Sequence, residues 1–418
     1  MRFAIILSCV VAAGAGAQDA IVNVNVYDVK SGEVQRDVVI LLNGDRIAGV
    51  GKGLPVPRGA RVLDAKGATA YPGFIDGWTT LGLTEVPSVQ ATNDANEIGR
   101  WNAHMRAGAA VNPHSAHFPV ARVNGITTAV VVPGGGTLPG EAALFDLFGR
   151  TVPQMRIEKP GALRVLRLPA PPRQTFTKKE AKDAEKKLKK SWKPLVEQLD
   201  KARRLGKLLA AGAANAGRAV PGQERLSLRA TAEHLQRGDP WLVWADSRTH
   251  ILAALRFAKE NDLKLVIGGL KEGWTVAKQL ANTPHGLLVG SPFGRVGAED
   301  PYDAGYANAA ALHRAGVKFG ICTNSSSNVR NLPYQAAQAV AYGLPRGVAI
   351  RAMTSEPARI LGIGRTHGSV EEGKVANLVL YDGDPLDARI NPKHLFIRGV
   401  RVPLISRHTY LAEPFLPR

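Results

Sequence analysis

The chain has 418 residues, of which 45% are hydrophobic and 21% are charged. This composition excludes an intrinsically disordered protein, and the length allows one large domain or two modest ones. The formal net charge of +19 favours contact with anionic partners, although charge alone does not determine a fold.

The N-terminus predicts a cleavable export signal. Arg2 provides a positive start, an apolar stretch follows, and small residues end the segment at Ala17, ahead of Gln18. The apolar stretch is shorter than the roughly 20 residues that span a bilayer, so we expect residues 1–17 to be removed and the protein to be periplasmic or secreted. The remaining chain keeps one cysteine, Cys322, which we expect to be a packed core thiol without a disulfide.

Residues 20–70 predict β-structure, because apolar side chains alternate from Ile21 to Val26. Two further apolar runs, 38–42 and 46–50, flank Asn43-Gly44, a pair that is typical of a tight hairpin turn because it tolerates positive φ.

From Pro72 onward the pattern changes to alternating strands and helices. Apolar runs predict buried strands at residues 127–132, 241–245, 263–267, 287–289 and 317–322. Helical patterns between them indicate repeated strand–helix units and therefore a parallel sheet, either a barrel or doubly wound.

A lysine-rich segment within this body predicts a long helix. Thr177 and Glu180 have the spacing of a capping box at its start, and Pro194 is expected to break or kink it. Its lysines are Lys178, Lys179, Lys182, Lys186, Lys187, Lys189, Lys190 and Lys193. The simpler interpretation is a solvated helix face, and the alternative is a docking surface for an anionic envelope polymer. Trp192 is the one aromatic residue among these lysines, which is too few for the stacking of successive bases, so we expect no specific nucleic-acid binding.

After residue 364 the chain returns to β-structure, at residues 375–381 and 395–402. Neither terminal β region is long enough for a stable sandwich by itself. We therefore expect the two regions to pair into one small domain beside the βα body.

Three parts of the chain resemble the amidohydrolase superfamily, in its imidazolonepropionase-like secreted branch. They read ILLNGDRIAGVG with VLDAKGATAYPGFIDG, then NGITTAVVVPGGGTLPGEAALFDLFG, and finally RNLPYQAAQAVAYGLPRGVAIRAMTSEPARILGI with HGSVEEGKVANLVLYDGDPL. The resemblance implies an α/β fold: a TIM-like (β/α)8 barrel with a small composite β-sandwich domain built from both termini. The implied boundaries are 1–17 for the signal peptide, 71–362 for the barrel, and 18–70 with 363–418 for the β domain.

The same resemblance implies a hydrolase of C–N bonds that acts on cyclic amides or dipeptide-like substrates. Its barrel mouth would hold zinc or another divalent metal, which lowers the pKa of a bound water.

The positions that hold metal in such relatives carry different side chains here. Trp78 and Thr80 stand where two histidines are expected after the first barrel strand. Trp244 and Gly268 stand where further histidines are expected, and Asn324 replaces an aspartate that would bind metal and accept a proton. An indole nitrogen only donates, and an amide is no general base at neutral pH. We therefore expect a vestigial pocket at these five positions and no cofactor.

Other side chains offer a weaker route to a working site. Asp76, Glu85 and Glu141 are acids on segments expected near the pocket, and a pair of carboxylates can perform acid–base chemistry. His114 and His117 have a spacing that can bind metal on a helix face, but prolines flank them. The sequence therefore gives no confident catalytic residue.

Three functions remain open from the sequence. The first is a pseudoenzyme: an exported, non-catalytic protein that binds a ligand or supports a metal-bearing paralogous subunit in a homo- or hetero-oligomer. The second is a C–N hydrolase with an altered active site. The third is a cationic surface protein whose lysine-rich helix docks on an anionic envelope polymer. The joint change at the metal positions favours the first, but function belongs to a site and a fold alone does not decide it.

Overall fold

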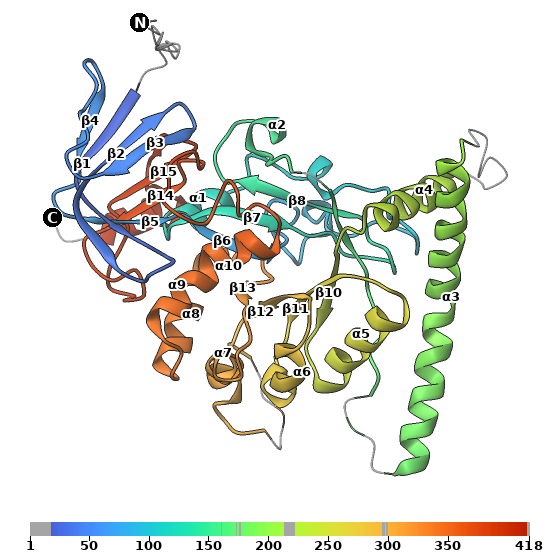
Figure 1. The fold of residues 1–418 in the computed structure, drawn as a ribbon. Helices are drawn as coiled ribbons and strands as arrows, with labels where there is room; N and C mark the ends of the chain where they lie inside the picture. Colours follow the sequence, from blue (N-terminus) through green and yellow to red (C-terminus); the bar gives the residue numbers. More distant parts are fainter. Residues whose placement is uncertain are drawn as a thin grey trace, which may run out of the picture.

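The structure is a computed structural model that describes residues 18–159, 161–172, 174, 177–212, 222–294, 297 and 300–415. The expected export signal, residues 1–17, lies outside the described residues. Figure 1 shows a β domain that combines the two ends of the chain, a barrel beside it, and a long helix on the far side of the barrel.

The barrel sheet has the strand order β13-β12-β11-β10-β9-β8-β7-β6. Its two edges meet at a parallel bridge between Thr79 and Ser325, and Asn324 donates to the carbonyl of Trp78 beside it. The expected TIM-like barrel with a β-rich companion domain is therefore confirmed, with a nearly closed sheet. The barrel strands are β6 (Phe74–Thr79), β7 (Ile126–Val131), β8 (Glu141–Asp146), β9 (Leu163–Val165), β10 (Trp241–Ala245), β11 (Leu265–Gly269), β12 (Gly286–Val289) and β13 (Gly320–Ile321).

One barrel strand runs against the others. β8 pairs antiparallel with both β7 and β9, whereas the remaining pairs are parallel. The expectation of a uniformly parallel sheet is wrong here. The reason is that residues 132–140, between β7 and β8, are too few for the dozen or more residues that a parallel crossover needs.

Side chains from the barrel strands and the residues that follow them fill the barrel interior. This interior cluster contains Ile75, Trp78, Val130, Val132, Ala142, Leu144, Leu163, Val165, Leu242, Val266, Leu288 and Cys322, with Trp244 packed against it. Cys322 is free and fully buried, and burial raises the pKa of its thiol well above the usual value. The expectation of a packed core thiol is confirmed, and the barrel is a packed core rather than a pore.

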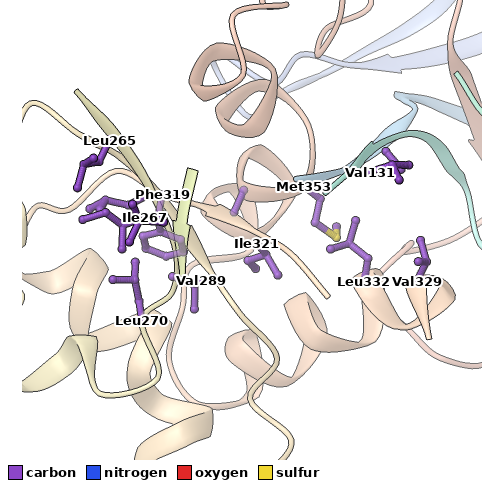
Figure 2. Packing of buried hydrophobic residues seen from close by; sticks show 14 of the residues in the cluster. Val131, Leu265, Ile267, Leu270, Val289, Phe319, Ile321, Val329, Leu332 and Met353 are labelled. Atoms are coloured by element: carbon purple, nitrogen blue, oxygen red, sulfur yellow. The ribbon is translucent and has the colours of Figure 1, made fainter. Parts of the chain in front are cut away.

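Helices cover the outer face of the barrel. Figure 2 shows part of this outer core, where Ile267 and Val289 lie near Phe319, with Leu332 and Met353 further along. The helices are α1 (His117–Arg122), α2 (Val152–Met155), α3 (Lys178–Ala210), α4 (Gly222–Arg237), α5 (Arg248–Glu260), α6 (Ala277–Ala281), α7 (Ala304–Arg314), α8 (Leu332–Ala341), α9 (Arg346–Met353), α10 (Ser355–Ile360) and α11 (Arg407–Ala412). Single 3-10 turns are η1 (Gln90–Thr92), η2 (Ala107–Ala109), η3 (Gly273–Val276), η4 (Val329–Asn331) and η5 (Glu413–Phe415).

The β domain is one branched sheet with the order β16-β15-β14-β5-β1-β2-β3, and β4 pairs with β1. Its strands are β1 (Gln18–Tyr27), β2 (Val34–Asn43), β3 (Arg46–Gly51), β4 (Arg61–Asp64), β5 (Thr69–Pro72), β14 (Leu378–Tyr381), β15 (His394–Ile397) and β16 (Val400–Val402). The expected hairpin joins β2 to β3, and Gly44 has φ 57° at its turn. The two terminal regions meet where β14 pairs with β5.

The long helix α3 begins with the predicted capping box. Thr177 accepts from the backbone of Glu180, whose side chain accepts from the backbone of Thr177. Of the two expected effects of Pro194, a break does not occur, because α3 continues through it to Ala210. Tertiary packing offsets the lost hydrogen bond, since Trp192 stacks edge-on against Phe257 of α5 with ring centroids 5.0 Å apart. Among the described residues, no helix is both long and apolar enough to cross a membrane.

Candidate functional site

Two tryptophans meet at the barrel mouth, the end at which β6, β10 and β11 finish. The ring centroids of Trp78 and Trp244 are 5.1 Å apart with an interplanar angle of 64°, an edge-to-face arrangement. Trp78 is buried and Trp244 is half-buried. The indole Nε1 of Trp244 donates to Asp246 Oδ2 at 2.8 Å, which fixes the ring orientation.

Gly268 of β11 makes room for both indoles. A Cβ at this position would lie 2.8 Å from Trp244 Cε3 and 2.8 Å from Trp78 Cε3. Real Cβ atoms essentially never approach so closely, so a larger residue here would displace a ring. The structure therefore brings Trp78, Trp244 and Gly268 together, although they come from three separate strands.

Thr80 and Asn324 lie at the seam where the barrel closes. Thr80 donates its backbone N–H to Ser325, and Asn324 donates its backbone N–H to Trp78. Asn324 is exposed and has φ 50°, a conformation that asparagine adopts more readily than most residues. These two positions therefore adjoin Trp78 at the closing seam.

Asp76 is fully buried at the same seam. Its Oδ1 accepts from the backbone of Trp78 at 3.2 Å and of Thr323 at 3.1 Å, and its Oδ2 accepts from Thr323 Oγ1 at 2.5 Å. Burial raises the pKa of Asp76 to about 7, because these uncharged donors offset only part of the desolvation of the carboxylate. The side chain can therefore hold a proton near neutral pH.

The other sequence candidates have separate partners. His117 Nε2 lies 2.9 Å from the carbonyl of Glu85 and 4.0 Å from its Oε2, and Glu85 Oε1 is buried without a hydrogen bond to any described residue. His114 is exposed. Glu141 forms an ion pair of 3.0 Å with Arg164, the residue opposite it on β9. The three acids are therefore not shown to converge on one reaction centre.

The side chains at the five positions singled out from the sequence do not fit a divalent metal. Neither indole has a lone pair for a metal, glycine has no side chain, and an amide or hydroxyl oxygen is a weak ligand by itself. Among the described residues, no group of three or more His, Cys, Asp or Glu side chains is arranged to hold a metal. These five positions therefore offer no ligand set for a metal.

Two polar partners at the mouth were missed by the sequence interpretation. Asp246 follows Trp244 by two residues at the end of β10, and acids at strand ends on this face of a barrel indicate a functional position. Thr323 holds Asp76 with two hydrogen bonds, a contact across 247 residues that no sequence pattern indicates.

Comparisons with known proteins point to one class. Residues 298–402 match the model of the Amidohydrolase family. Over 79 residues the chain is 33% identical to "Amidohydrolase tasK" of Hapsidospora irregularis, which is 19% of this chain. The match spans only 8% of the length of that relative.

Solved structures share the fold over nearly the whole chain. An amidohydrolase from Thermotoga maritima MSB8 aligns with a TM-score of 0.75 and 21% identity, covering 93% of this chain and 100% of the other. Molinate hydrolase aligns with a TM-score of 0.57 and 15% identity over 96% and 97% of the two chains. A putative prolidase from Bifidobacterium longum aligns with a TM-score of 0.52 and 16% identity over 96% and 99%.

The barrel with its composite β domain is thus the amidohydrolase fold. The match at residues 298–402 adds sequence support for the superfamily and for a protein of hydrolase type.

Proposed function

We propose that this chain is an exported member of the amidohydrolase superfamily, in the imidazolonepropionase-like branch, that has become a pseudoenzyme. Its barrel mouth binds a ligand or a partner subunit without a metal. One observation carries the proposal: two indoles and a glycine stand together where the family resemblance expects metal ligands.

The packing of the mouth supports this function. Trp78 belongs to the interior cluster and Trp244 packs against it, so both rings contribute apolar contact to the barrel core. Gly290 of the segment after β12 also approaches Trp244, since a Cβ there would lie 3.2 Å from Cη2.

Two exposed apolar side chains on segments that follow barrel strands are candidates for contact with a partner subunit. Ile98 is 90% exposed on the segment after β6, and Tyr302 is 83% exposed on the segment after β12. These segments leave the mouth ends of parallel strands, where a second subunit could cover them. The partner is a metal-bearing paralogous amidohydrolase or a second copy of this chain.

Elemental mass spectrometry tests the metal-free mouth. The chain without residues 1–17 is dialysed against trace zinc and manganese, with a metal-dependent amidohydrolase as the control. We expect far less than one metal per chain while the control is loaded. One tightly bound metal per chain would contradict the proposal and would direct attention to His114, His117 and the acids.

Sedimentation velocity tests the partner surface. If two copies associate through the mouth, Ile98→Asp should dissociate them, whereas Val56→Asp in the β domain should not, although Val56 is also exposed at 38%. A chain that is monomeric alone would direct the search to a hetero-oligomer.

The second candidate is a C–N hydrolase with an altered site that acts on cyclic amides or dipeptide-like compounds. Asp76 favours it, because a carboxyl with a pKa of about 7 can exchange a proton at neutral pH. Asp76 is fully buried, however, so a substrate would have to displace the residues that cover it. Turnover of an amide panel that is abolished by Asp76→Asn would establish this candidate over the first.

A further inference from the structure

Five lysines form a straight row along one side of α3. Their spacing is i, i+4, i+8, i+11 and i+15, so they lie within roughly 80° of arc and extend over about 22 Å of the helix axis. This lysine row consists of Lys178, Lys182, Lys186, Lys189 and Lys193, all of which are exposed. Figure 1 shows α3 on the outer side of the molecule, away from the β domain.

Packing against the rest of the molecule turns the lysine row toward solvent. Leu188, Trp192 and Leu195 are buried on a different face of α3, and the guanidinium of Arg256 lies 5.2 Å from the Trp192 ring. Further along, Ala202 and Leu205 pack against Leu228 of α4. The buried residues of α3 begin at Leu188, so the helix is anchored from there onward and holds Lys189 and Lys193 in place before a partner binds.

The charge of the row is only slightly neutralised. Lys189 pairs with Glu185 at 3.3 Å and Lys193 with Glu197 at 3.9 Å, both between exposed side chains. Such surface pairs are weak. Within the described chain, Lys178, Lys182 and Lys186 have no ion pair, and residues 178–193 contain eight lysines against three acids.

The surroundings of the row indicate which polyanion fits it. No large apolar side chain is exposed on α3 between residues 178 and 207, and the exposed Leu208 lies beyond the row near the other end of the helix. The row therefore has no apolar wedge beside it with which to enter a membrane. No exposed aromatic ring lies in the row for stacking on a base. The ammonium groups of the row follow one another along a straight line. A linear polymer with anionic groups along its repeating sugar units can therefore contact several of them at once.

We propose that the lysine row docks the protein on a linear anionic polysaccharide. The polymer lies along α3, and its carboxylate or sulfate groups meet several ammonium groups at once. This interaction is independent of what the barrel mouth binds, so it survives or fails separately from the proposed function.

Binding of fluorescein-labelled heparin, a sulfated linear polysaccharide, tests the row. The row variant replaces the five lysines with glutamine: Lys178→Gln, Lys182→Gln, Lys186→Gln, Lys189→Gln and Lys193→Gln. The matched control removes the same charge at scattered exposed lysines: Lys52→Gln, Lys259→Gln, Lys264→Gln, Lys278→Gln and Lys318→Gln. Circular dichroism checks that both variants remain folded, and glutamine has a helix propensity close to that of lysine.

We expect the row variant to lose about tenfold or more in affinity with a shallower salt dependence, and the control to lose about twofold or less. Equal losses in both variants would overturn the proposal, because the overall net charge would then explain binding. Tighter row-dependent binding to duplex DNA, or to vesicles containing phosphatidylglycerol, than to heparin would overturn it in favour of another macromolecule.

Discussion

Asp76 and Asp146 are both fully buried in the barrel, yet their pKa values are shifted in opposite directions. Asp76, at the seam between β6 and β13, accepts only from uncharged donors among the described residues, and burial raises its pKa to about 7. Asp146 lies where the barrel meets the β domain. Burial alone would raise its pKa, but hydrogen bonds from His367 and Arg398 outweigh burial and lower it.

The difference between the two pKa shifts comes from the donors around each carboxyl. At the junction, Asp146 accepts from Arg398 Nε at 2.7 Å, from Asn377 Nδ2 at 2.7 Å and from Thr128 Oγ1 at 3.1 Å. These donors come from both domains, so the hydrogen bonds to the Asp146 carboxylate connect the barrel to the β domain. At the mouth, no cationic side chain of the described residues donates to Asp76, so burial raises the pKa of this carboxyl and favours its protonated form below about pH 7.

The largest expected effect is at the junction. Arg398→Met removes the cation from a buried carboxylate and should lower the free energy of unfolding by about 3–5 kcal/mol, measured by urea denaturation. The control is Arg389→Met, which breaks an exposed pair with Asp387 and should cause no measurable change. Equal effects of the two variants would show that Asp146 does not depend on its cation.

A second prediction concerns pH. The folded pKa of Asp76, about 7, exceeds the unfolded value of 3.8, so the folded protein binds more protons between them. Its contribution to stability is therefore full below pH 3.8 and is lost as the pH rises through 7, by at most roughly 1.4 kcal/mol per pH unit. The stability difference between wild type and Asp76→Asn should fall across this window, and a difference that is constant with pH would contradict the raised pKa.

A third prediction concerns the space between the indoles. Gly268→Ala places a methyl group against Trp78 and Trp244, and we expect it to lower stability by about 1–3 kcal/mol in thermal unfolding. Gly222→Ala is the control, because a Cβ at Gly222 would have nothing within 4 Å. If both variants were equally stable, the indoles of Trp78 and Trp244 would have room to move away from the added methyl group, which would contradict the tight packing at Gly268.

The smallest expected effect is the loss of the Trp244–Asp246 hydrogen bond. Trp244→Phe should lower stability by about 1 kcal/mol or slightly more beyond its change in ring size. A double-mutant cycle with Asp246→Asn separates the two contributions. A coupling energy near zero would mean that the bond does not hold the indole in place.

Much of the fold could be predicted from the sequence because its signals are local. Residues 241–245 form β10 as expected, the Thr177 box begins α3, and Asn43-Gly44 leads into the hairpin turn. The reversal of β8 was missed because an apolar run contains no information about strand direction. Pro194 does not break α3, because tertiary packing overrides a local preference.

The mouth was less predictable because its contacts are long-range. The family resemblance singled out Trp78, Trp244 and Gly268 separately, but only the structure shows that a Cβ at Gly268 would strike both rings. The partners Asp246 and Thr323, and the Asp146 network, depend on strand packing that residue patterns do not reveal.

The placement of α3 has a further consequence for how the molecule can vary. The chain leaves the barrel after β9 and returns at β10, and these two strands are hydrogen-bonded neighbours. The excursion that contains α3 and α4 therefore begins and ends at almost the same place. An insertion of this kind can be lengthened, shortened or recharged while the register of the barrel strands stays the same. The barrel strands can thus stay unchanged while the exposed surface of α3 changes in sequence and charge. Such changes need not alter the residues at the barrel mouth.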